Sequence, residues 1–193
     1  MMRMLLMGPP GAGKGTQAKV LAQRLGIPAI STGDIFRANM AEETDLGLEA
    51  KRYVDAGEYV PDDVTNRMVR ARLAEPDAAK GFLLDGYPRT VAQVENLDEF
   101  LAETGKALNA VVVIKADPDE IVRRLLKRAE VEGRSDDTEE VIRRRQEVYS
   151  EQTAPLLEVY ADHGVLVEVN GVGDVEDVSE RVLKAIAPLE TEQ

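Results

Sequence analysis

Short apolar runs alternate with longer segments of helical period along most of this chain. Apolar residues fill the short runs almost without interruption, whereas in the segments between them they recur every three or four positions. Continuous apolar strands that alternate with amphipathic helices are typical of a parallel sheet with helices on both faces. The pattern therefore predicts an α/β fold with strands at Met2–Met7, Pro28–Ile30, Gly81–Leu84, Ala110–Ile114 and Leu166–Val169.

Helices are expected after the longer strands, at Lys14–Leu25, Val91–Thr104, Asp119–Lys127 and Val175–Ala187. Thr90 is the expected N-cap of the second helix, and Asp136 or Asp137 that of a long helical pattern over Glu139–Tyr160. Pro155 lies inside that pattern, so we expect it to bend or divide the helix.

Residues 31–60 break the alternation of strands and helices. They contain two helical patterns, Asp34–Ala41 and Leu46–Ala56, but no convincing strand. We interpret them as an all-helical insertion that ends before a helix beginning near Pro61. A second piece, Ala129–Asp137, carries Gly133 and is expected to be irregular.

Composition narrows the class of protein. A length of 193 residues suits one globular domain with a small insertion, and a net charge of −12 argues against a sequence-independent nucleic-acid binder. No segment approaches the roughly 20 apolar residues that span a bilayer, and the apolar start is too short for a signal-peptide core. The absence of cysteine excludes disulfides and thiolate metal sites. We expect a cytoplasmic protein that binds neither nucleic acid nor membranes.

A glycine-rich loop, GPPGAGKGT over Gly8–Thr16, follows the first predicted strand and opens the first predicted helix. Glycines let backbone N–H groups turn toward phosphates, and the helix N-terminus adds partial positive charge. Lys14 can reach the β- and γ-phosphates, and Thr16 lies where its hydroxyl can meet the Mg²⁺ shell. The general motif has Ser or Thr directly after the Lys, where this chain has Gly15. Asp85, at the end of another apolar run, is suited to orienting Mg²⁺ and its waters.

With further motifs added, the sequence resembles the adenylate kinase family along nearly its whole length. Gly15 fits, because nucleoside-monophosphate kinases carry it in their version of the loop. The resemblance rests on GPPGAGKGTQA (Gly8–Ala18), STGDIFR (Ser31–Arg37), EYVPD (Glu58–Asp62), LLDGYPRT (Leu83–Thr90), Gln93, GRSDDT (Gly133–Thr138) and Arg145.

The resemblance implies a P-loop NTPase-type parallel β-sheet core flanked by helices, with a helical AMP-binding insertion and a short lid. The core would comprise residues 1–30, 61–126 and 138–193, the AMP-binding domain 31–60 and the lid 127–137. The implied activity is the Mg²⁺-dependent reaction ATP + AMP ⇌ 2 ADP, carried out by a monomer. Zinc is not expected, because the lid is of the short form and has no cysteine.

The resemblance also assigns roles to individual residues. The catalytic cations would be Lys14, Arg89, Arg128, Arg134 and Arg145. The ATP-binding residues would be Gly11, Ala12, Gly13, Lys14, Gly15, Thr16, Arg128 and Gly171. The AMP-binding residues would be Thr32, Arg37, Glu58, Tyr59, Val60, Gly86, Tyr87, Pro88, Arg89, Gln93, Arg134 and Arg145. Phosphates and water would hold most of the Mg²⁺ shell, with Thr16 and Asp85 as outer-shell groups.

Two alternatives to adenylate kinase activity can be weighed by residue chemistry. A kinase for UMP or CMP would share the phosphate machinery, but Gln93 favours AMP because its amide offers both the donor and the acceptor that adenine requires. A regulatory switch would bind a single nucleotide and would not need a second phosphate grip at Arg37 and Arg89. Arginine suits such a grip because its planar fork can bond two phosphate oxygens at once.

Overall fold

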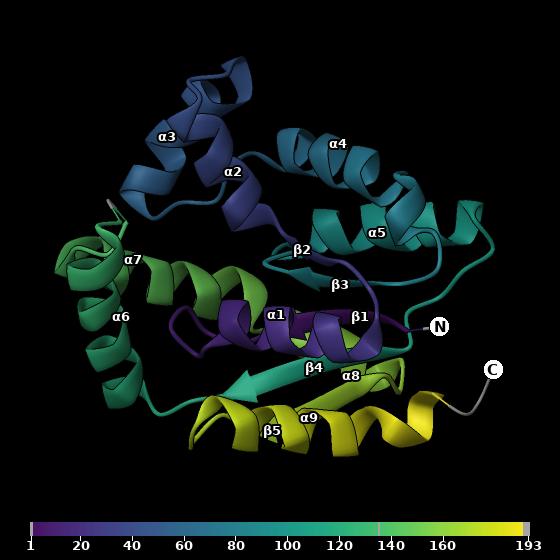
Figure 1. The fold of residues 1–193 in the computed structure, drawn as a ribbon. Helices are drawn as coiled ribbons and strands as arrows, with labels where there is room; N and C mark the ends of the chain where they lie inside the picture. The colour runs from purple at the N-terminus through teal and green to yellow at the C-terminus, as the bar shows by residue number, and fades with distance from the viewer. Residues whose placement is uncertain (1, 135, 191–193) are drawn as a thin grey trace.

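Five parallel strands form one sheet at the centre of this computed structural model, which describes residues 2–134 and 136–190 (Figure 1). Each strand pairs in parallel with its neighbours in the spatial order β2-β3-β1-β4-β5. The strands are β1 (Arg3–Met7), β2 (Ala29–Ser31), β3 (Phe82–Asp85), β4 (Ala110–Lys115) and β5 (Leu166–Asn170). The α/β class and all five predicted strands are confirmed. Met1, Ser135 and residues 191–193 of the predicted core and lid lie outside the described residues.

Helices cover both faces of the sheet, as the unbroken apolar strands require. Successive side chains of β1 point to opposite faces, so Leu5 and Met7 belong to one buried cluster and Met4 and Leu6 to the other. The first cluster is covered by α4 (Asp62–Leu73), α5 (Val91–Glu103) and α8 (Leu156–Asp162), and the second by α1 (Lys14–Leu25) and α9 (Val175–Glu190). Thr90 caps α5 as predicted, because its side chain accepts a hydrogen bond from the N–H of Gln93.

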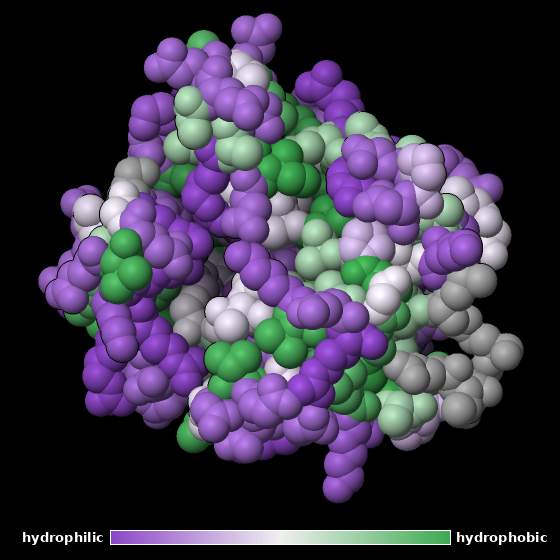
Figure 2. All heavy atoms as spheres, viewed as in Figure 1, coloured by the Kyte–Doolittle hydropathy of each residue, from purple (hydrophilic) through white to green (hydrophobic). Residues whose placement is uncertain are grey.

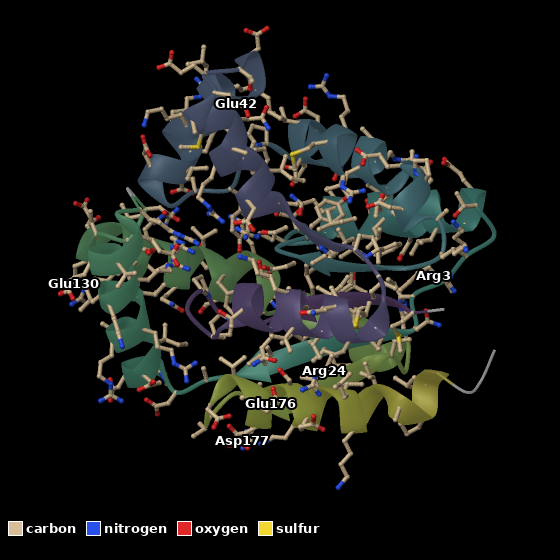
Figure 3. All side chains as sticks on the ribbon, viewed as in Figure 1. Arg3, Arg24, Glu42, Glu130, Glu176 and Asp177 are labelled. Atoms are coloured by element: carbon tan, nitrogen blue, oxygen red, sulfur yellow. The ribbon has the colours of Figure 1, made fainter. Side chains whose placement is uncertain are left out.

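The surface around this core is mostly polar. Figure 2 shows hydrophilic side chains over most of the visible face, with apolar residues in separate patches. In Figure 3, Arg24 of α1 lies beside Glu176 of α9, and the two form an ion pair across the interface of these helices. In the described part of the chain, no helix is both long enough and apolar enough to cross a membrane.

Two helices, α2 (Thr32–Ala41) and α3 (Asp45–Ala56), make up the predicted helical insertion between β2 and α4. They pack around a small cluster that includes Phe36 and Ala50 and extends to Val64 of α4. Gly47 of α3 lies against the backbone of α2, since a Cβ built on it would be 2.1 Å from the carbonyl oxygen of Asn39. The insertion therefore shares a small core with α4 and has a backbone contact that only glycine permits.

The helix α6 (Pro118–Glu132) is longer than the sequence analysis predicts. The prediction ends it at Lys127 and leaves Ala129–Asp137 irregular, whereas the structure continues the helix to Glu132. Alanine and glutamate are good helix formers, and Gly133 ends the helix in the left-handed conformation with φ 60°. Among the described residues of the expected irregular segment, Gly133, Arg134, Asp136 and Asp137 are non-helical.

The predicted N-cap of the next helix, α7 (Glu139–Val148), is wrong. Its N-cap is Thr138, whose side chain accepts a hydrogen bond from the N–H of Val141, and not Asp136 or Asp137. The predicted division of the long helical pattern by Pro155 is confirmed. After α7 comes a short π-helical stretch, η2 (Tyr149–Thr153), and then α8.

The close contact between α2 and α3 yields a stability prediction. Gly47→Ala is expected to lower the free energy of unfolding by about 1–3 kcal/mol, because the added methyl must push two backbones apart. Denaturant unfolding measures this change. Leu48→Ala is the matched control on the same helix, because Leu48 is 59% exposed and should change stability by about 0.5 kcal/mol or less. Equal stability of Gly47→Ala and the wild type would contradict the α2–α3 packing.

Candidate functional site

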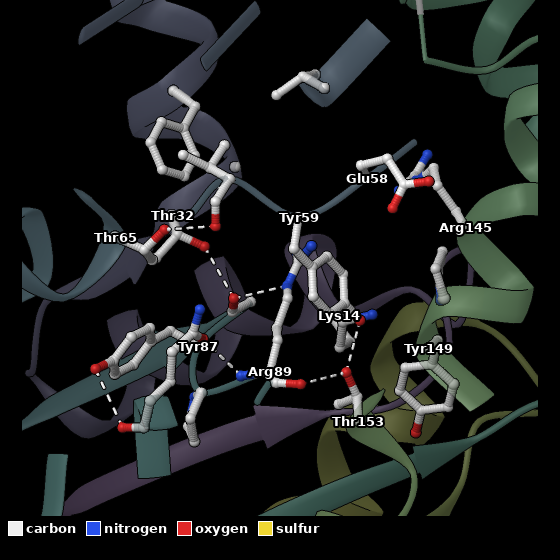
Figure 4. A pocket seen from close by; sticks show the side chains of 18 of the residues that line it. Lys14, Thr32, Glu58, Tyr59, Thr65, Tyr87, Arg89, Arg145, Tyr149 and Thr153 are labelled. Atoms are coloured by element: carbon white, nitrogen blue, oxygen red, sulfur yellow. Dashed lines mark hydrogen bonds between the residues drawn. The ribbon is translucent and has the colours of Figure 1, made fainter. Parts of the chain in front are cut away.

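The carboxyl ends of β1 and β3 meet at one edge of the sheet. Leu6 of β1 pairs with Asp85 of β3, so the glycine-rich loop after β1 begins beside the turn that follows β3. Ligands of open parallel sheets bind at such an edge. One cavity opens there, and it is lined from Lys14 at the start of α1 to Gln93 in α5 (Figure 4).

The glycine-rich loop has the geometry of a phosphate cradle. Gly11 and Gly13 have φ of 87° and 93°, which side chains rarely adopt. Gly13 is the N-cap of α1 and offers no side-chain cap, so the helix's first N–H groups remain available to an anion. The Nζ of Lys14 donates to the carbonyl oxygens of Gly8 at 2.8 Å and Pro9 at 3.0 Å, which holds it over the loop.

Lys14 lies in an electropositive environment. Its pKa is lowered to about 8, chiefly by burial; the charge of Asp85 opposes this shift, and the charges of Arg89, Arg145 and Arg128 add to it. A cation held under such conditions gains when an anion arrives. The loop therefore carries a positive charge that the protein alone leaves poorly compensated.

Asp85 supplies an acidic group next to the loop. It is 8% exposed, and burial raises its pKa while the neighbouring Lys14 and Arg89 act in the opposite direction. A Cβ built on Gly15 would lie 3.8 Å from its Oδ2, so the backbone after Lys14 faces this carboxylate. Thr16 is exposed on the first turn of α1. Within residues 2–134 and 136–190, no cluster of three His, Cys, Asp or Glu side chains could hold a metal ion by itself.

Hydrogen bonds fix the other end of the cavity around Gly86. The Oγ1 of Thr32 donates to the carbonyl oxygen of Gly86 at 3.0 Å, and the Nε of Arg89 donates to the same oxygen at 2.7 Å. The backbone N–H of Arg89 donates to Oε1 of Gln93 at 2.7 Å, and Nε2 of Gln93 donates to Oδ1 of Asp62 at 2.8 Å. Thr32, Arg89 and Gln93 are thus held in one bonded frame.

The amide of Gln93 retains half of its hydrogen-bonding capacity. Its oxygen uses one lone pair for Arg89, and its nitrogen uses one hydrogen for Asp62. A glutamine amide has two of each, so one acceptor and one donor remain. Gln93 is only 2% exposed, so the side chain that carries these two groups is held by its surroundings.

Two aspartates hold two of the predicted catalytic arginines. Arg128 makes a two-pronged ion pair with Asp137, with Nε donating to Oδ2 at 2.6 Å. Arg145 pairs with Asp137 at 2.9 Å and Asp136 at 3.1 Å. Burial lowers the pKa of Arg145 to about 10, although Asp136 opposes this shift. The side chain of Asp137 is fully buried, so it is shared between two guanidinium groups away from water.

Some of the remaining predicted phosphate-binding cations form an ion pair with a carboxylate, and others do not. Arg37 pairs with Asp34 at 2.7 Å, and Arg134 pairs with Glu132 at 2.6 Å. In the part of the chain that the structure describes, no carboxylate forms an ion pair with Arg89. Lys14 is likewise without an ion pair there. Both cations line the cavity.

Comparisons with known proteins agree with this geometry. The family model described as adenylate kinase matches residues 6–165. An adenylate kinase of a Nocardioides species is 66% identical, covering 96% of this chain and 97% of its own length. Those of Kocuria rhizophila and Thermobifida fusca are 60% and 55% identical, each covering 96% of this chain and 99% and 98% of their own lengths. The chain belongs to the adenylate kinase family.

The structure brings most of the family's predicted site residues together, but not all. Lys14, Arg89 and Arg145 line the same cavity, and Gly171 lies against the loop, since a Cβ built on it would be 3.7 Å from the carbonyl oxygen of Ala12. The predicted site residues that do not line that cavity are Gly11, Ala12, Gly13, Gly15, Thr16, Asp85, Arg128, Arg134 and Gly171. The roles assigned to these residues from the adenylate kinase resemblance stay predictions.

The sequence analysis missed two residues that contact the loop. Nη1 of Arg124 lies 3.5 Å from the carbonyl oxygen of Ala12, and Nη2 lies 3.4 Å from that of Gly171. Its spacing of four residues from Arg128 on one helix was a usable signal. The second residue, Gln146, donates to the carbonyl oxygen of Pro10 at 2.9 Å, and nothing in the sequence pattern marks it.

Loss of the carboxylate that Arg128 and Arg145 share should strongly destabilise the protein. Asp137→Asn should lower the free energy of unfolding by about 3 kcal/mol, because it leaves two neighbouring guanidinium groups without their common counter-charge. Chemical denaturation at neutral pH measures this loss. Glu139→Gln is the control, since its ion pair with Arg143 is exposed and should contribute less than about 1 kcal/mol. Similar small losses in both variants would show that Asp137 does not hold the arginines together.

Proposed function

We propose that this chain catalyses the reversible, Mg²⁺-dependent transfer of a phosphoryl group between ATP and AMP, which yields two ADP. One observation carries the proposal: a single cavity joins the glycine-rich loop at Lys14 to Arg89 and Gln93. Phosphoryl transfer requires mainly positioning and charge stabilisation of two nucleotides in line. Membership of the adenylate kinase family supports the same reaction.

ATP would bind at the loop end of the cavity. Backbone N–H groups of residues 11–16 and the Nζ of Lys14 would bind its phosphates. The guanidinium of Arg124, placed between Ala12 and Gly171, would lie over the part of ATP that extends out of the loop. Gly171 would meet the nucleotide through its backbone.

The residues present fit a Mg²⁺ ion carried in with ATP. The hydroxyl of Thr16 and the carboxylate of Asp85 are hard oxygen groups of the kind that Mg²⁺ and its waters prefer. When bound, Mg²⁺ would neutralise part of the phosphate charge. Asp85 would orient the ion's water shell, while Lys14 remains free to bind phosphate. The proposal includes no zinc.

AMP would bind at the other end of the cavity. Its phosphate would meet Arg89, with Arg37 exchanging Asp34 for the ligand. The acceptor and donor left on the Gln93 amide match the N6 amino group and the N1 nitrogen of adenine. Thr32, the backbone of residues 58–60 and the turn 86–88 would enclose the nucleotide, which makes residues 31–60 the AMP-binding domain.

Transfer would require the arginines of α6 and α7 to exchange partners. Phosphate oxygens would replace Asp137 and Asp136 as acceptors for Arg128 and Arg145, and Arg134 would join them from the lid at 127–137. Closure of the lid and of residues 31–60 would exclude water and prevent wasteful hydrolysis of ATP. We take the protein to act in this way as a cytoplasmic monomer on free nucleotides, without nucleic-acid or membrane partners.

Phosphorus NMR of the purified protein tests the proposed reaction. Mg-ATP is supplied with AMP, UMP, CMP or no acceptor in parallel samples. Of the three acceptors, only AMP should give rapid ADP formation. Little ATP should be hydrolysed in the sample without an acceptor. Equal transfer to UMP or CMP would identify a pyrimidine kinase, and slow hydrolysis regardless of acceptor would contradict phosphoryl transfer altogether.

Replacement of Arg89 tests whether this residue binds AMP and not ATP. Arg89→Ala should reduce kcat/KM for AMP by about 100-fold or more, because a charge-assisted, two-pronged phosphate contact is lost. The Kd for ATP should change by no more than about threefold. Steady-state kinetics and calorimetry measure the two quantities, with Arg143→Ala as the control on the exposed face of α7. An equal loss for both nucleotides would contradict the assignment of Arg89 to AMP.

A further inference from the structure

Three segments that are distant in sequence meet around Arg89. Tyr59 follows α3, Thr153 ends η2, and Arg89 lies in the turn between β3 and α5. The hydroxyl of Tyr59 is 2.6 Å from Oγ1 of Thr153, and this Oγ1 is 2.9 Å from the carbonyl oxygen of Arg89. Figure 4 shows Thr153 between the other two residues, with the ring of Tyr59 beside the Arg89 side chain.

The direction of the two hydrogen bonds follows from the number of hydrogens. Thr153 has one hydroxyl hydrogen, and the carbonyl oxygen of Arg89 can only accept. Thr153 therefore donates to Arg89, which leaves Tyr59 to donate to Thr153. The chain runs from the Tyr59 hydroxyl through Thr153, which is 4% exposed, to the backbone of Arg89.

The same tyrosine also contacts the other end of Arg89. The guanidinium carbon lies 5.1 Å from the centroid of the Tyr59 ring, within the range of a cation–π contact. The Nε of Arg89 donates to the carbonyl oxygen of Gly86, so one face and one N–H of the guanidinium are fixed. The terminal nitrogens keep their edge toward the cavity, and no carboxylate among the described residues pairs with them.

Tyr59 comes from the helical insertion, whereas Thr153 and Arg89 belong to the core. The insertion lies against α7 in this structure, because Glu58 pairs with Arg144 at 2.6 Å and Gly57 packs on Val141. Contact between Tyr59 and Arg89 thus exists when the insertion rests on the core. Movement of the insertion away from α7 would withdraw both the ring and the hydroxyl from Arg89.

We propose that Tyr59 is a positioning residue for Arg89, whose ring and hydroxyl orient the arginine fork toward the phosphate of AMP when residues 31–60 close on the core. This inference rests on the proposed function, because it takes the anion bound by Arg89 to be the AMP phosphate. It extends that function, since it makes the grip on the acceptor phosphate depend on closure of the AMP-binding segment.

Kinetics of Tyr59→Phe test the hydroxyl, with the ring retained. We expect the KM for AMP to rise about fivefold and the KM for ATP to stay within about twofold of the wild-type value, because one hydrogen bond to the Arg89 support is lost. Tyr53→Phe is the matched control: it makes the same substitution in the same insertion and removes a surface hydrogen bond from Arg52. It should leave both KM values unchanged.

Thr153→Val tests whether the two hydroxyls act as one chain. It should raise the KM for AMP by a similar factor, and the double variant with Tyr59→Phe should raise it by less than the product of the two single effects. Thermal unfolding by circular dichroism checks that each variant is folded. Three results would overturn the proposal: a double variant whose KM for AMP rises by the full product of the single effects, equal changes of KM for AMP and ATP, or an unchanged KM for AMP in Tyr59→Phe.

A spectroscopic measurement reports on the ring contact directly. The Arg89 Nε–H resonance of ¹⁵N-labelled protein should carry a ring-current shift that persists in Tyr59→Phe and disappears in Tyr59→Leu. An unchanged resonance in Tyr59→Leu would overturn the proposal, because the ring would then not contact Arg89. If the wild type forms no ADP from AMP, the proposed function fails and this inference fails with it. If the wild type is active and Tyr59→Phe behaves like it, only the inference fails.

Discussion

The site of this protein holds several cations close together, and their positive charge is not fully compensated by the protein. The chain has a net charge of −12, yet Arg89, Arg128 and Arg145 lie close enough to Lys14 to lower its pKa. Their mutual repulsion is overcome by the fold, which fixes each cation on a different element. A bound polyphosphate would offset this repulsion, which would favour binding of the nucleotides.

An aspartate and two glycines help to hold the cations in place. Asp137 lies buried between two arginines and is their shared counter-charge, which a phosphate would replace under the proposed function. Gly11 and Gly13 turn the loop through positive φ before Lys14, which lines the cavity. In the proposed reaction, exchangeable ion pairs would bind phosphate on one side and the glycine-rich backbone would bind it on the other.

Local signals predicted the strands, the loop and the cap at Thr90, because each depends on neighbouring residues or on a fixed spacing. The extension of α6 to Glu132 was missed because Gly133 was interpreted as part of an irregular segment and not as a helix end. The contacts of Arg124 with the loop and of Tyr59 with Thr153 join residues about a hundred positions apart. No short-range pattern encodes such pairs, so only the folded structure reveals them.

Calorimetric titration with a single molecule in which two adenosines are joined through five phosphates shows whether one cavity accommodates the phosphates of two nucleotides at once. We expect one such molecule to bind per chain, and the bound protein to take up neither ATP nor AMP. Binding of two molecules per chain, or displacement of ATP while AMP still binds, would contradict a shared cavity.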